Sequence, residues 1–108
     1  MFKIDCDALS DDEVETLAWL LSKRLPSFSS VEGVPQGGLR LATAMGKFAA
    51  KEGPLLIVDD VFTTGGSMEE HRAGRYNVIG AVLFARGPCP FWIKPLFSMD
   101  LLPKDCLD

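Results

Sequence analysis

The apolar residues of this chain follow two spacings in turn, one typical of helices and one typical of buried strands. Near the N-terminus, Ser10 and Glu13 have the spacing of a capping box, which predicts a helix that begins there and that Pro26 stops. Its apolar face would carry Val14, Leu17, Ala18, Leu21 and Leu25. Farther along, the apolar runs at 55–58 and within 76–85 predict strands that are buried on both faces, as in a parallel sheet.

The segments around these runs complete an α/β pattern. We expect a short strand at 29–34, a helix at 39–50, a helix that ends near residue 74, and a final strand or packed tail at 91–102. Strands that alternate with helices favour a Rossmann-like parallel sheet with helices on both faces. The length predicts a single domain, 1–108, with an N-terminal helical segment at 1–27 and a core at 28–102.

Composition narrows the class of protein. Hydrophobic residues make up 47% of the 108 residues and charged residues 24%, as in ordinary globular proteins, and no apolar run is long enough to span a bilayer. Acids interrupt the N-terminal segment, so we expect no signal peptide. Cys6, Cys89 and Cys106 are odd in number and lack metal-ligand spacing, which favours reduced thiols in a cytoplasmic protein. The net charge of −4 argues against a nucleic-acid partner.

The segment 55–67 carries the clearest chemistry. An apolar strand ends in the acid pair Asp59 and Asp60, and a turn of hydroxyls and glycines then leads toward a helix. The residues of this turn are Thr63, Thr64, Gly65, Gly66 and Ser67. Backbone N–H groups in such a turn can bind phosphate, and two carboxylates suit ribose hydroxyls or Mg²⁺. The alternative is a polar strand end with a tight turn that binds nothing.

A second glycine-rich turn follows the strand expected at 29–34. It contains Pro35, Gln36, Gly37 and Gly38, and it again leads from a strand end into a helix. Two phosphate-binding turns at neighbouring strand ends could hold both ends of one ligand, although an ordinary turn between strand and helix has the same composition. Arg40, one turn into the following helix, would either add positive charge to this loop or lie in solvent.

Thirteen consecutive positions, 55–67, resemble the motif of type I phosphoribosyltransferases that binds phosphoribosyl pyrophosphate (PRPP). The resemblance implies that Asp59 and Asp60 bind the ribose hydroxyls and that residues 63–67 bind the 5-phosphate. It also implies that the loop at 35–38 binds pyrophosphate, that this loop often carries a non-proline cis peptide bond, and that Mg²⁺ accompanies PRPP. Many members have Lys or Arg where this chain has Gln36.

Within that family, the chain is most similar to orotate phosphoribosyltransferases. The resemblance to these enzymes implies that Arg86, just after the strand at 76–85, binds the carboxylate of orotate, and that Thr63 also contacts the base. An Arg fork suits a carboxylate because it can bind both oxygens at once. Alternatively, Arg86 ends a strand in solvent.

The chain also departs from the family. Catalytic members carry another strand or two and a long mobile loop between the two motifs, whereas here the helix at 39–50 leads almost directly into the strand at 55. Three hypotheses follow: a shortened orotate-type transferase that works as a homodimer or with a partner subunit, a non-catalytic module that binds PRPP or a nucleoside monophosphate, and a scaffold with a vestigial pocket. We assign His71, Trp19 and Trp92 to structure and packing rather than to the site.

Overall fold

The computed structural model describes residues 9–64 and 66–98, and it contains a four-stranded sheet. The strands are β1 (Ser30–Gly33), β2 (Leu55–Phe62), β3 (Val78–Ala85) and β4 (Ile93–Ser98), and they lie in chain order with every neighbouring pair parallel. The register pairs Ser30 with Leu55, Leu55 with Val78, and Gly80 with Ile93. The predicted α/β class, a Rossmann-like parallel sheet, is therefore confirmed.

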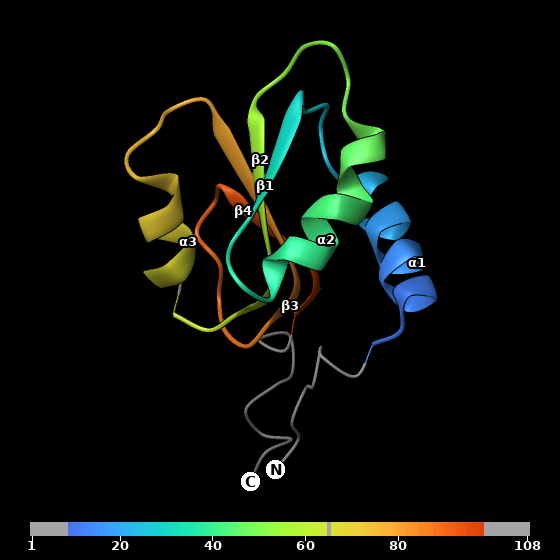
Figure 1. The fold of residues 1–108 in the computed structure, drawn as a ribbon. Helices are drawn as coiled ribbons and strands as arrows, with labels where there is room; N and C mark the ends of the chain where they lie inside the picture. Colours follow the sequence, from blue (N-terminus) through green and yellow to red (C-terminus); the bar gives the residue numbers. More distant parts are fainter. Residues whose placement is uncertain (1–8, 65, 99–108) are drawn as a thin grey trace, which may run out of the picture.

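One face of the sheet is covered by α1 (Asp11–Ser22) and α2 (Gly38–Met45), which continues into the 3₁₀ turn η2 (Gly46–Phe48) (Figure 1). The predicted capping box is present, because the Ser10 hydroxyl accepts from the Glu13 N–H and the Glu13 carboxylate accepts from the Ser10 N–H. The core on this face consists of Val14, Ala18, Leu21, Phe28, Leu41, Ala44, Met45, Leu56, Val58, Ala81, Leu83 and Leu96.

The opposite face is covered by α3 (Gly66–Arg72), as Figure 1 shows. Its core consists of Val34, Ile57, Phe62, Met68, Val82, Ala85, Trp92 and Ile93. The connections from β1 to β2 and from β2 to β3 both move one strand along the sheet in the same direction, but they pass over opposite faces. One connection is therefore right-handed and the other left-handed, and left-handed connections between parallel strands are rare. Consequently the loops that precede α2 and α3 leave the carboxyl edge of the sheet toward opposite faces.

Several predicted boundaries were wrong. The first helix ends at Ser22 rather than at Pro26, because the chain tightens into a turn in which the Arg24 N–H donates to the Leu21 carbonyl. The Arg24 side chain then donates to the Leu96 carbonyl on β4, which fixes the chain against the sheet.

The helix predicted at 39–50 is also shorter. It spans Gly38–Met45 and η2, and residues 49–50 are extended because the Ala50 N–H donates to the Phe28 carbonyl. The segment at 91–102 contains the strand β4 over Ile93–Ser98, while residues 99–102 lie outside the described residues.

The two tryptophans differ in burial. Trp92 is packed as predicted, with 8% of its surface exposed and its indole N–H donating to Glu69. Trp19 is 49% exposed on α1, so its assignment to packing was wrong; it lies on the solvent side of that helix, where the Lys23 ammonium sits over its ring. Among the described residues, no helix has the length and apolar character that crossing a membrane requires.

Candidate functional site

Two loops and an acid pair meet at the carboxyl edge of β1 and β2. The loop at 34–37 joins β1 to α2, and the loop that begins at Thr63 joins β2 to α3. Because β1 and β2 are adjacent and parallel, both loops leave the sheet at the same edge. Asp59 and Asp60 lie at the end of β2 between them, and Gly65 lies outside the described residues.

Asp59 is the buried member of the acid pair. Only 9% of its surface is exposed, and its Oδ1 accepts a hydrogen bond of 2.8 Å from the Asp60 N–H. Burial, together with the neighbouring carboxyl group of Asp60, raises the pKa of Asp59 to about 7. The Asp59 carboxyl group therefore titrates near neutral pH, where its protonated form can donate a hydrogen bond and its ionised form can only accept one.

Asp60 is partly exposed and faces the other loop. Its Oδ1 accepts from the Val61 N–H at 2.8 Å, which orients the carboxylate. Its second oxygen, Oδ2, would lie 2.3 Å from a Cβ atom built on Gly37. A side chain at position 37 would therefore collide with this carboxylate and displace it.

The same loop also lies tightly against the backbone of the sheet. A Cβ atom on Gly38 would come within 2.4 Å of the Val58 carbonyl oxygen, and one on Gly33 within 2.4 Å of the Gly38 carbonyl oxygen. The Pro35–Gln36 peptide bond is cis, which answers a question that the family resemblance left open at this loop. Pro35 and Gln36 are exposed, whereas Gly38 is buried as the first residue of α2.

A solvent-open hollow of about 330 Å³ adjoins this loop on the α1 and α2 side of the sheet. It is lined by Leu9, Val14, Gln36, Gly37, Leu39, Arg40, Leu41, Asp60 and Leu83. Arg40 thus belongs to the wall, but its Nη2 donates to the Leu9 carbonyl at 2.7 Å and to Asp11 Oδ1 at 3.2 Å. The side chain of Arg40 thus borders the hollow, while its charge is paired with Asp11 at the start of α1, and a role in phosphate binding stays a prediction.

A second, smaller hollow of about 30 Å³ lies at the loop after β2. It is lined by Asp59, Val61, Phe62, Thr63, Thr64, Gly66, Ser67 and Met68. Thr63, Thr64, Gly66 and Ser67 are exposed, so their hydroxyl groups and backbone are accessible to a ligand. The larger hollow adjoins Asp60, and the smaller one adjoins Asp59.

Arg86 follows β3 at the same edge of the sheet. Its N–H donates to the Phe62 carbonyl at 2.9 Å, and its side chain is exposed. A Cβ atom on the next residue, Gly87, would lie 3.9 Å from the Thr63 carbonyl oxygen. Arg86 and Thr63 therefore belong to neighbouring loops, although the carboxylate contact that the resemblance implies stays a prediction.

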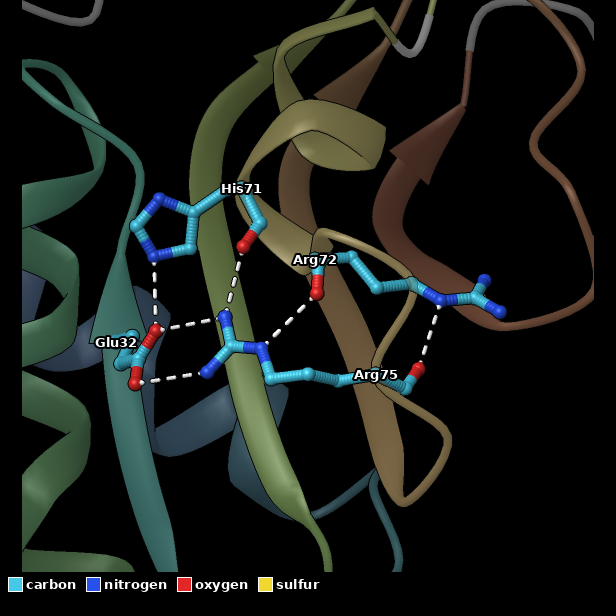
Figure 2. Close-up of polar contacts among 4 residues, drawn as sticks. All are labelled: Glu32, His71, Arg72 and Arg75. Carbon is cyan, nitrogen blue, oxygen red and sulfur yellow. Dashed lines mark hydrogen bonds and ion pairs between the residues drawn. The ribbon is translucent and has the colours of Figure 1, made fainter.

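Sequence reasoning missed a polar cluster that joins β1 to the C-terminal end of α3. Glu32 of β1 accepts hydrogen bonds from His71 and Arg75, which lie at and just after the end of α3 (Figure 2). The hydrogen bonds from Arg75 lower the pKa of Glu32, and the carboxylate in turn raises the pKa of Arg75. A charged residue within a four-residue strand was the available signal, but the partners are remote in sequence.

Comparison with known proteins identifies the class of fold. No protein-family model and no curated protein matches the sequence. Solved structures do match, and they show that the chain has a fold like that of the type I phosphoribosyltransferases.

One such structure is the orotate phosphoribosyltransferase of Aeropyrum pernix, with a TM-score of 0.70 and 21% identity, over 96% of this chain and 82% of that one. Another is the purine phosphoribosyltransferase of Pyrococcus horikoshii, with a TM-score of 0.54 and 20% identity, over 88% of this chain and 93% of that one. The first likeness covers more of the chain than the predicted core at 28–102.

Proposed function

We propose that this chain binds PRPP or a nucleoside 5-monophosphate at the carboxyl edge of β1 and β2. The observation that carries the proposal is the contact between Gly37 and Asp60, which joins one glycine-rich loop to the acid pair that precedes the other. In this proposal Asp59 and Asp60 accept hydrogen bonds from the ribose hydroxyls, and residues 63–67 bind the 5-phosphate. The loop at 35–38 binds the pyrophosphate, chiefly through backbone N–H groups.

Mg²⁺ fits this site as an ion that arrives with the substrate. Within the part of the chain that the structure describes, no group of three or more His, Cys, Asp or Glu side chains gathers to form a dedicated metal site. Mg²⁺ in proteins is commonly held by one or two carboxylates together with substrate phosphates, and Asp60 offers such a carboxylate. The ion would neutralise charge on a departing pyrophosphate.

For the reaction, we propose transfer of the phosphoribosyl group from PRPP to a pyrimidine base of the orotate type. The likeness to the Aeropyrum orotate phosphoribosyltransferase supports this choice, as does Arg86 at the end of β3 with its exposed guanidinium group. The chemistry asks the protein mainly to position the two reactants and to stabilise charge, which the two loops and the acid pair can do. A homodimer or a partner subunit in the cytoplasm belongs to the same proposal.

The second candidate function is a non-catalytic module that binds the same ligands. One observation favours it: residues 49–54 alone connect η2 to β2, where the resemblance implies a long mobile loop. Such loops exclude water from the reacting centre. The binding residues are the same in both candidates, so only turnover separates them.

A pyrophosphate-release assay separates the two candidates. The purified protein is incubated with PRPP and Mg²⁺, first alone and then with orotate, uracil or hypoxanthine. The transferase proposal predicts release that depends on orotate and is lost in Arg86→Gln. Saturable PRPP binding without release for any base would establish the module instead. Release that requires hypoxanthine would contradict the orotate assignment while keeping the transferase.

A further inference from the structure

The polar cluster of Glu32, His71 and Arg75 connects the two segments that hold the candidate phosphate loops. Glu32 lies on β1, three residues before Pro35, and His71 lies on α3, four residues after Ser67. The Glu32 carboxylate accepts a hydrogen bond from His71 Nε2 at 2.9 Å and one from each terminal nitrogen of Arg75, at 3.2 and 3.1 Å. Figure 2 shows these bonds converging on Glu32 from the end of α3.

Arg75 is held more firmly than an exposed arginine normally is. Its Nε donates to the Arg72 carbonyl at 2.9 Å and its Nη2 to the His71 carbonyl at 2.7 Å, so every nitrogen of the guanidinium group is bonded. The two carbonyls belong to the last turn of α3, where Ala73 and Gly74 with positive φ reverse the chain. Arg75 thus closes the end of α3 and binds β1 with one planar group.

β1 is an edge strand among the described residues, held by its pairing with β2 and by α2 on one face. It has four residues, and among the described strands it pairs with β2 alone. Val31 packs toward the α1 and α2 side, and Glu32, next along the strand, points to the α3 side. The bidentate contact between the Arg75 guanidinium group and the Glu32 carboxylate fixes the geometry of this link more closely than a single exposed ion pair would.

We propose that Glu32 is a positioning residue that, through His71 and Arg75, sets the separation of the two phosphate loops. A ligand with phosphate groups at both ends, such as PRPP, then gains from occupying both loops at once. A ligand that occupies only one of the loops gains nothing from their separation. This inference rests on the proposed function, and it adds a determinant of ligand class that lies outside the loops.

The test compares three ligands, each with Mg²⁺, by calorimetry: PRPP, ribose 5-phosphate and inorganic pyrophosphate. In Glu32→Gln, the affinity for PRPP is expected to fall about tenfold while the other two affinities change by less than about twofold. Arg75→Gln should behave in the same way and serves if Glu32→Gln does not fold. The matched control is Glu15→Gln, because Glu15 pairs with Lys47 between α1 and η2 at similar exposure and away from the loops.

Each outcome decides something. If Glu32→Gln weakens all three ligands equally, or none of them, the positioning role is wrong while the proposed function stands. If the wild-type protein fails to bind PRPP, the proposed function fails and the positioning role fails with it. Thermal unfolding of each variant shows whether the protein is folded, and lowered stability with an unchanged ratio of affinities would leave Glu32 a merely structural role.

Discussion

Gly37 and Asp60 lie so close together that a Cβ atom on Gly37 would come within 2.3 Å of Asp60 Oδ2. Gly37 belongs to the loop after β1, whereas Asp60 lies within β2 near its carboxyl end, and the two are far apart in sequence. Their contact means that the first loop and the Asp60 carboxylate form one surface, whereas Asp59 lines the hollow at the other loop. Any ligand that binds the carboxylates lies beside the loop that is proposed to bind pyrophosphate.

Gly37→Ala tests this contact. We expect the added methyl group to displace the Asp60 carboxylate and to lower PRPP affinity by about tenfold or more, since misplacement of a binding group by about 1 Å is costly. The measurement is calorimetric titration of the variant with PRPP and Mg²⁺.

Gly46→Ala is the matched control for that substitution. A Cβ atom on Gly46 would meet nothing within 4 Å, and the residue has helical backbone angles, φ −56° and ψ −34°. We therefore expect unchanged PRPP affinity and a gain of about 0.5 kcal/mol in the free energy of unfolding. Equal PRPP affinity in both variants would show that the Gly37 contact does not shape the site.

Asp60→Asn removes one negative charge from the acid pair without changing its size. Hydrogen bonds to a charged group contribute about 1.5–3 kcal/mol, so PRPP affinity should fall by about one to two orders of magnitude. Asp12→Asn, on the exposed first turn of α1, is the control and should leave the affinity unchanged. Retained affinity in Asp60→Asn would place the ribose elsewhere.

The raised pKa of Asp59 predicts that the stability of the protein depends on pH near neutrality. Its pKa is about 7 in the folded protein against 3.8 as the ordinary value, so between these values the folded protein keeps a proton that the unfolded chain has lost. The free energy of unfolding contributed by this group therefore falls as pH rises, by on the order of 2 kcal/mol between about pH 5 and pH 7.

Urea unfolding of the wild-type protein and of Asp59→Asn at several pH values measures this contribution. The amide oxygen of Asn can still accept the Asp60 N–H, but it does not ionise, so the fall should be smaller in the variant. Glu13 and Glu32 have lowered pKa values, and their contributions change only at more acidic pH. Parallel pH curves for the two proteins would mean that Asp59 is ionised throughout.

Arg86→Gln tests the choice of base. If the guanidinium group binds the carboxylate of orotate, the variant should lose about 1.5–3 kcal/mol of orotate binding in the presence of PRPP, while PRPP affinity alone stays the same. Arg24→Gln is not a suitable control, because Arg24 anchors the chain to β4. Lys94→Gln is better, because it removes one exposed positive charge from β4 without an ion pair among the described residues. A loss of PRPP affinity in Arg86→Gln would assign Arg86 to phosphate binding instead.

The strands and the two loops were predictable from the sequence because each has a strong local signal. Four consecutive apolar residues at 55–58 indicate a strand buried on both faces, because a half-buried strand would alternate apolar and polar residues. Glycine next to a strand end marks close backbone approach. The end of α1 was missed because the chain tightens into a local turn at Arg24, and the extended residues after η2 were missed because the Ala50 N–H bonds the distant Phe28 carbonyl. Local propensity carries no information about partners so distant in the chain.

The Glu32 cluster could not have been assembled from sequence. Glu32 lies 39 residues from His71 and 43 from Arg75, and the three meet only because α3 covers the face of the sheet toward which Glu32 points. Likewise, the sequence shows that two glycine-rich loops exist, but their contact depends on β1 and β2 being adjacent and in register. Sequence reasoning expected the two loops at neighbouring strand ends, but it could not supply this register.

The central claim is that one ligand bridges both loops across the acid pair, and titration of the wild-type protein with PRPP and Mg²⁺ tests it most directly. We expect saturable binding with a stoichiometry of one per chain and an affinity greater than that for ribose 5-phosphate or pyrophosphate alone. Binding of PRPP no tighter than that of ribose 5-phosphate, or the absence of binding at millimolar concentration, would contradict the claim.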